Sequence, residues 1–86
     1  MAFNILYKKP VQRDLKKLSK AEAKTILDQL EKELSENADA FPMLKGRFTG
    51  LRKYRVGDFR VVYAIIEKDV IVLRIRHRKE VYRGDI

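Results

Sequence analysis

The chain has 86 residues, with 20 lysines and arginines against 12 acidic residues, a formal net charge of +8 and no cysteine. A chain of this length forms one domain with a small core, here expected over residues 1–86, and without cysteine it has no disulfide. No apolar run suits a signal peptide or a membrane span, so we expect a cytoplasmic protein with no membrane partner. The excess positive charge indicates an anionic partner, first of all a nucleic acid.

The N-terminal half predicts one strand and two helices. Alternating apolar residues predict a strand over residues 3–8. Pro10 fits the first turn of the helix that follows, because its missing N–H needs no partner there. Ser19 and Glu22 have the spacing of a capping box, which predicts the start of a second helix ending near Asn37.

The C-terminal half predicts three strands, at residues 51–56, 59–67 and 70–78. Proline and glycine mark residues 38–50 as a loop before them. The order of elements therefore predicts an α+β domain. It consists of an N-terminal strand, a two-helix hairpin and a three-stranded antiparallel meander, with the helices packed on one face of a four-stranded sheet.

The register of these strands predicts a row of arginines. A two-residue turn at Gly57-Asp58 pairs Arg55 with Arg60. Matching the apolar faces of the last two strands calls for a three-residue loop at 68–70, which places Arg60 beside Arg78. Like charges directly opposite one another destabilise a sheet, so the row predicts a phosphate-bearing ligand. The alternative is a basic face that contacts only solvent.

In the fourth strand the same register turns three apolar residues toward the helices: Ile71, Leu73 and Ile75. Further basic residues then share the face of the arginine row: Lys53, Arg74 and Arg76. A slip of one residue would bury Arg74 and Arg76, so the hydrophobic pattern favours this register.

Residues 51–83, "LRKYRVGDFRVVYAIIEKDVIVLRIRHRKEVYR", resemble the RelE/ParE superfamily of bacterial and archaeal toxins, on the RelE side. The similarity is sharpest in "YRVGDFRVVY" and "RHRKEVY", and with the helical hairpin it covers nearly the whole chain. The resemblance implies a RelE-like fold and an endoribonuclease that cuts messenger RNA in the A site of the ribosome. It also implies a cognate acidic antitoxin protein that holds the toxin silent.

The resemblance also implies which residues act. Matching the motifs to the basic strand residues and the C-terminal tyrosine of the family gives a catalytic set: Lys53, Arg55, Arg60, Arg78 and Tyr82. Arg55 stands where the best-known member has a lysine, so that lysine's role is not carried over to it. Three further arginines are expected to bind RNA: Arg52, Arg74 and Arg76.

Cleavage of RNA by its own 2′-hydroxyl needs a proton acceptor and cations that stabilise the phosphorane. Lys53 is the first candidate for the acceptor, because crowding by guanidinium groups favours loss of its proton. Glu80 and His77 are alternatives, although His77 is expected to face the core. Tyr82 is expected to stack on a base or orient the hydroxyl. With one histidine, no cysteine and no carboxylates clustered on the basic face, we expect no metal site and no cofactor.

Two other functions are compatible with the sequence. A ParE-type protein would inhibit DNA gyrase without nuclease activity, and a non-toxic module would only bind RNA. A small acidic reading frame beside the gene would argue against the RNA-binding module. Cut messages, as opposed to broken DNA, would separate the nuclease from the gyrase inhibitor.

Overall fold

The computed structural model describes residues 3–44 and 50–77. It contains four strands and two α-helices in the predicted β-α-α-β-β-β order, with a short 3-10 helix after the second α-helix. The elements are β1 (Asn4–Tyr7), α1 (Lys9–Lys16), α2 (Lys20–Asn37), η1 (Ala38–Ala40), β2 (Arg52–Val56), β3 (Phe59–Ile66) and β4 (Asp69–His77).

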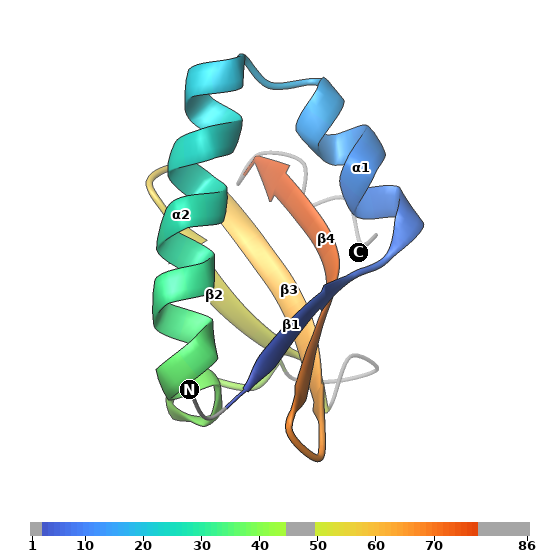
Figure 1. Ribbon diagram of the computed structural model, residues 1–86, viewed down its shortest axis with the longest axis vertical. Helices are drawn as coiled ribbons and strands as arrows, with labels where there is room; N and C mark the ends of the chain where they lie inside the picture. The colour runs from blue at the N-terminus through green and yellow to red at the C-terminus, as the bar shows by residue number, and fades with distance from the viewer. Residues whose placement is uncertain (1–2, 45–49, 78–86) are drawn as a thin grey trace.

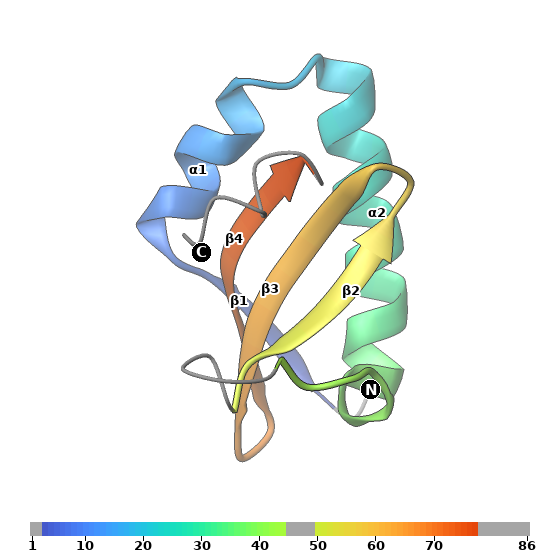
Figure 2. The same cartoon turned by 180° about the vertical axis from the view of Figure 1, so that it is seen from behind.

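The strands form one sheet in the order β1-β4-β3-β2. β1 runs parallel to β4, and the other neighbouring pairs are antiparallel. Both helices lie on one face of the sheet (Figure 1), and the view from behind shows the opposite face with neither helix over it (Figure 2). We call this opposite face the outer face. The predicted α+β class, with helices on one side of a four-stranded sheet, is confirmed.

Both predicted helix starts are confirmed. Pro10 occupies the first turn of α1. At the start of α2, the Ser19 Oγ accepts a hydrogen bond from the Glu22 backbone N–H at 3.1 Å, and the Glu22 carboxylate accepts one from the Ser19 N–H at 3.2 Å. This capping box satisfies two backbone donors that the first turn of a helix leaves without partners. It therefore fixes where α2 begins.

The helices and the inner face of the sheet enclose the core. Its buried residues come from both helices, η1 and three strands: Val11, Ile26, Leu30, Leu34, Ala38, Val56, Val61, Tyr63, Val70, Val72 and Ile75. Tyr7 and Tyr54 are partly buried and pack against this cluster. No helix in the described ranges is both long and apolar enough to cross a membrane.

Tyr63 connects the sheet to the end of α2. Its side chain is fully buried, and its hydroxyl donates a hydrogen bond of 2.6 Å to the Ala38 carbonyl oxygen. Burial raises the pKa of Tyr63 to about 12; the charge of Arg52 lowers it and that of Asp39 raises it. The hydroxyl therefore remains protonated in the folded protein at a pH where an exposed tyrosine ionises.

Stability is expected to fall as the pH rises from about 10 to about 12. Unfolded tyrosine has a pKa of about 10, so above that pH the unfolded state loses a proton that folded Tyr63 still holds. Tyr63 alone contributes a slope of at most about 1.4 kcal/mol per pH unit. Denaturant unfolding at several pH values between 9 and about 12 measures this slope. Tyr63→Phe should be less stable at neutral pH but show a shallower alkaline slope; an unchanged slope would contradict the assignment.

The β2–β3 hairpin has the predicted register. Val56 pairs with Phe59 and Arg55 pairs with Arg60, across a two-residue turn. Gly57 has a φ of +58°, which suits the first position of a tight hairpin turn. Residues that carry a side chain rarely adopt this φ.

The predicted register of the β3–β4 hairpin is wrong. The expected three-residue loop would have paired Glu67 with Ile71. In the structure Ile66 pairs with Asp69, so the loop is the two residues Glu67 and Lys68. Glu67 has a φ of +57°, an uncommon conformation for a residue with a side chain.

A β-bulge compensates for the shorter loop. Tyr63 pairs with Val72, but its neighbour Val62 pairs with Arg74, which leaves Leu73 as an extra residue in β4. One extra residue reverses which alternate side chains face each side of a strand. The basic residues beyond the bulge consequently lie on the outer face.

The bulge also changes which apolar residues of β4 face the helices. Val70 and Val72 are fully buried before it, and Ile75 is buried after it. The prediction for Ile75 is therefore confirmed. The prediction for Ile71 is wrong, because Ile71 lies on the outer face opposite Ala64. Leu73 takes the bulge position in place of a regular core position.

Candidate nucleic-acid interface

Three arginines lie side by side on the outer face, one on each of β2, β3 and β4. Arg55 pairs with Arg60, and Arg60 pairs with Arg76. We call Arg55, Arg60 and Arg76 the cationic row. Directly opposite side chains in a sheet have Cβ atoms about 4.5–5.5 Å apart, and like charges at this distance are unfavourable. Arg76 takes the place expected for Arg78, which lies outside the described residues.

Lys53 lies one step along β2 from the cationic row. It pairs with Val62, which in turn pairs with Arg74, so these residues form a second line across the sheet. Lys53 also lines a pocket together with Arg55 and Arg60. Three cations of the predicted site therefore border one space.

Arg74 uses its guanidinium to hold α1 against β4. Its Nε lies 2.9 Å from Asp14 Oδ2, and its Nη2 donates to Oδ1 at 3.0 Å. Asp14 Oδ2 also accepts the Ile75 backbone N–H at 2.9 Å, and Asp14 is only 6% exposed. The pairing of β1 with β4 ends at Val72, so the carboxylate binds the edge of β4 just beyond it. The arginine expected to bind RNA thus has a structural partner.

Arg52 also has structural partners. Its Nη1 donates to the carbonyl oxygens of Phe41, at 2.7 Å, and Asp39, at 3.3 Å. Arg52 pairs with Tyr63, whose side chain is in the core. The Arg52 side chain therefore does not lie on the outer face with the cationic row. Its guanidinium fixes the chain that follows η1.

The remaining candidates lie at the end of β4. His77 pairs with Phe59, and the two rings meet edge-on with centroids 5.3 Å apart, which agrees with the expected position on the core side. Tyr82 and Glu80 lie outside the described residues. In residues 3–44 and 50–77, no group of three or more His, Asp or Glu side chains is placed to hold a metal ion.

A pocket of about 310 Å³ lies beside the cationic row. It is lined by three apolar or aromatic residues and three cations: Phe41, Pro42, Tyr54, Lys53, Arg55 and Arg60. Burial, with a contribution from the Glu33 carboxylate, raises the pKa of Tyr54. The sequence did not point to Phe41 and Pro42, because they belong to a loop whose position depends on contacts with β2.

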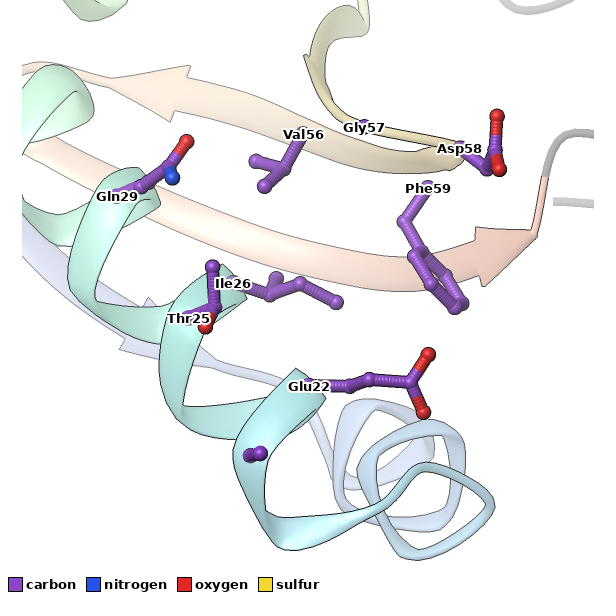
Figure 3. Close-up of a pocket in the computed structure, with 9 residues that line it drawn as sticks. Glu22, Thr25, Ile26, Gln29, Val56, Gly57, Asp58 and Phe59 are labelled. Carbon is purple, nitrogen blue, oxygen red and sulfur yellow. The ribbon is translucent and has the colours of Figure 1, made fainter.

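A larger pocket of about 460 Å³ lies between α2 and the β2–β3 turn. Figure 3 shows Ile26 and Phe59 pointing into this space, with Glu22 at one end and Asp58 near the turn. Among the residues that the structure describes, its lining contains two carboxylates and no lysine or arginine. The two carboxylates make this lining a poor match for a phosphate group, so we place the candidate interface on the outer face and its edge.

Comparison with protein families matches residues 5–82 to the model of the ParE toxin of type II toxin-antitoxin systems, parDE. The chain belongs to the ParE toxin family. The resemblance to the RelE/ParE superfamily is thereby confirmed. No match to this ParE-family toxin is found among curated proteins.

Solved structures of both toxin types resemble this ParE-family chain. The archaeal RelE–RelB complex from Pyrococcus horikoshii contains a chain that is 31% identical, with a TM-score of 0.65, 91% of this chain and 97% of that chain being covered. The RelBE2 complex of Mycobacterium tuberculosis gives a TM-score of 0.82 at 23% identity, and the match covers 91% of this chain and 93% of that chain. A chain of the chromosomal ParDE system of P. aeruginosa gives a TM-score of 0.70 at 17% identity. This match covers 88% of the present chain and 96% of the other. The matches to the M. tuberculosis and P. aeruginosa structures show the fold.

Proposed function

We propose that this ParE-family toxin is an endoribonuclease that cuts messenger RNA on the ribosome. A ribose 2′-hydroxyl attacks the adjacent phosphate, and the bond from phosphorus to the 5′-oxygen of the next nucleotide breaks. The cationic row carries the proposal. Arg55, Arg60 and Arg76 lie directly opposite one another on neighbouring strands, so they concentrate positive charge along one line across the sheet. Such a line of charge suits the phosphates of a nucleic acid, because guanidinium groups match phosphate oxygens in shape and charge.

The proposed reaction divides the work among residues of the outer face. Arg60 lies between Arg55 and Arg76, so it is best placed to stabilise charge that develops on the phosphorane. Lys53, which borders the same pocket as Arg55 and Arg60, is proposed to accept the proton of the 2′-hydroxyl. Arg78 and Tyr82 remain predicted members of this set, and the mechanism remains the metal-free one expected from the sequence.

Dependence on the ribosome follows from the weakness of the available bases. The single histidine of the chain packs edge-on against Phe59, on the core side. The proposed acceptor is a lysine, which can take a proton only as its neutral amine. Such a site gains most from a substrate held in the reactive geometry, and the ribosome would supply that positioning.

A second candidate function is inhibition of DNA gyrase without nuclease activity. It is favoured by the family model, which describes a ParE toxin. The two are distinguished by brief induction of the chain, followed by mapping of both transcript 5′ ends and DNA breaks. The nuclease gives new 5′ ends within translated messages before any DNA breaks appear. DNA breaks with intact messages would establish the gyrase inhibitor in its place.

We also propose that an acidic antitoxin protein covers the outer face. The end of this face away from the cationic row is apolar, with Leu6, Ile71 and Ala64 in one line across the sheet. Leu6 is 48% exposed and nearby Ile66 is 57% exposed. A segment with acidic residues at one end and apolar residues at the other would match both parts of this face.

Replacing Leu6 and Ile66 together by asparagine is expected to weaken antitoxin binding by at least about tenfold, because their apolar surface would no longer be buried in the complex. Met43→Asn is the matched control, since Met43 is also 48% exposed but lies in the loop before β2. Titration of the purified toxin variants with the proposed antitoxin measures the difference. Equal weakening by both changes would place the antitoxin elsewhere.

A further inference from the structure

The pocket beside the cationic row lies where the loop before β2 runs along the outer edge of that strand. The Lys53 N–H donates to the Pro42 carbonyl oxygen at 3.2 Å, and the Leu44 N–H donates to the Leu51 carbonyl oxygen at 2.8 Å. These bonds attach the loop to the strand as an added edge. The pocket, of about 310 Å³, opens beside this attachment.

The pocket has two chemically different sides. One is apolar: the rings of Phe41 and Tyr54 are in contact, with centroids 4.9 Å apart and planes at 59°, and Pro42 lies beside them. The other side is cationic and consists of Lys53, Arg55 and Arg60. The hydrogen bond from Arg52 to the Phe41 carbonyl oxygen fixes the backbone of Phe41, on the apolar side of the pocket. The pocket is therefore built before any ligand arrives.

A nucleotide presents both chemistries that this pocket offers. Unpaired bases stack on aromatic rings and on guanidinium planes, and the phosphate next to the base carries the negative charge. An acidic peptide would satisfy the cations but would leave the rings of Phe41 and Tyr54 and the ring of Pro42 without a counterpart. The combination therefore favours single-stranded RNA over an acidic side chain.

We propose that this pocket binds an unpaired nucleobase of the RNA strand whose adjacent phosphate lies on the cationic row. The inference rests on the proposed function, since it needs single-stranded RNA on the outer face. It assigns Phe41, Pro42 and Tyr54 as substrate-binding residues. It also gives Arg52 a role as a positioning residue that acts through the Phe41 carbonyl.

The test compares two RNA trinucleotides, both with 2′-deoxyribose at the first and middle positions, so that neither phosphate can be attacked by a neighbouring 2′-hydroxyl. In the second, the middle nucleotide also lacks its base. The full-length wild type is expected to bind the intact trinucleotide about tenfold or more tighter, as base–aromatic stacking predicts. Phe41→Leu should reduce this ratio to nearly one while the dependence of binding on salt is retained, because the cations remain. Phe3→Leu is the matched control, since Phe3 is also partly buried but lies outside the pocket.

The chain has no tryptophan, so Phe41→Trp adds its one indole to the pocket, and the emission of this indole can be excited apart from that of the tyrosines. Its emission should change on binding of the intact trinucleotide and not of the abasic one, which tests the inference even if Phe41→Leu folds poorly. Equal binding of both trinucleotides to the wild type, with normal message cleavage, would overturn the nucleobase pocket and leave the proposed function standing. Absence of RNA binding together with absence of message cleavage would overturn both.

Discussion

Arg60→Gln is expected to lower the rate of message cleavage by about 10²–10³, enough to abolish toxicity. Arg60 is the middle member of the cationic row, with Arg55 and Arg76 directly opposite it on the neighbouring strands. Removal of one electrostatic contact to a developing oxyanion typically has an effect of this size. The measurements are a growth assay after induction and the cleavage of ribosome-bound transcripts by the purified variant.

Arg13→Gln is the matched control, because it removes the same charge from an exposed position on α1. It should remain fully toxic, and both variants should retain the cooperative thermal unfolding of the wild type. A toxic Arg60→Gln would mean that the cationic row is only a solvent-exposed basic face. An Arg60→Gln variant that melts far below the wild type would make Arg60 a structural residue.

Asp14→Ala is expected to lower the free energy of unfolding by about 2–4 kcal/mol. The carboxylate accepts hydrogen bonds from Arg74 and from the Ile75 backbone N–H, and its side chain is only 5% exposed. The side chain of Arg74 is 24% exposed, so water screens part of the interaction, and we place the effect below that of a fully buried pair. The melting temperature should fall by roughly 10 °C or more.

Asp28→Ala provides the comparison for Asp14→Ala. It breaks the Lys24–Asp28 ion pair, whose side chains are 77% and 64% exposed, and should change the stability by no more than about 0.5 kcal/mol. A double-mutant cycle of Asp14→Ala with Arg74→Met then isolates the pair itself. If Asp14→Ala lowers the free energy of unfolding by no more than Asp28→Ala does, α1 is held on β4 by apolar packing alone.

The sequence predicts an element well where the signal is local. The capping box at Ser19 and Glu22 fixes the start of α2 through hydrogen bonds made within one turn. Gly57 supplies the positive φ of the β2–β3 turn, so the pairing of Arg55 with Arg60 could be predicted before any tertiary contact was known.

The β3–β4 hairpin was not predictable in the same way. Its turn places Glu67 at a positive φ, where glycine or asparagine would have been the recognisable signal. The bulge at Leu73 depends on how β4 fits between its neighbouring strands, which a pattern of alternating residues does not report. For this reason the sequence placed Arg78, and not Arg76, opposite Arg60.

In the candidate site, too, residues of one hairpin could be grouped from the sequence, whereas contacts between distant parts of the chain could not. Lys53, Arg55 and Arg60 could be grouped because neighbouring strands carry them. The structural role of Arg74 could not be seen, because its partner Asp14 is 60 residues away in the chain. Phe41 became a candidate only once the loop before β2 was placed along the edge of the sheet.

The parallel pairing of β1 with β4 has a consequence for the synthesis of this toxin. Asn4 pairs with Asp69, a separation of 65 residues, so β1 has no partner until β4 has left the ribosome. α1 likewise depends on β4, which supplies the donors of the hydrogen bonds that Asp14 accepts. Pairings of such long range form late and cooperatively. A nascent chain that ends before β4 should neither fold nor act, which delays toxicity until translation of the chain has reached its last described strand.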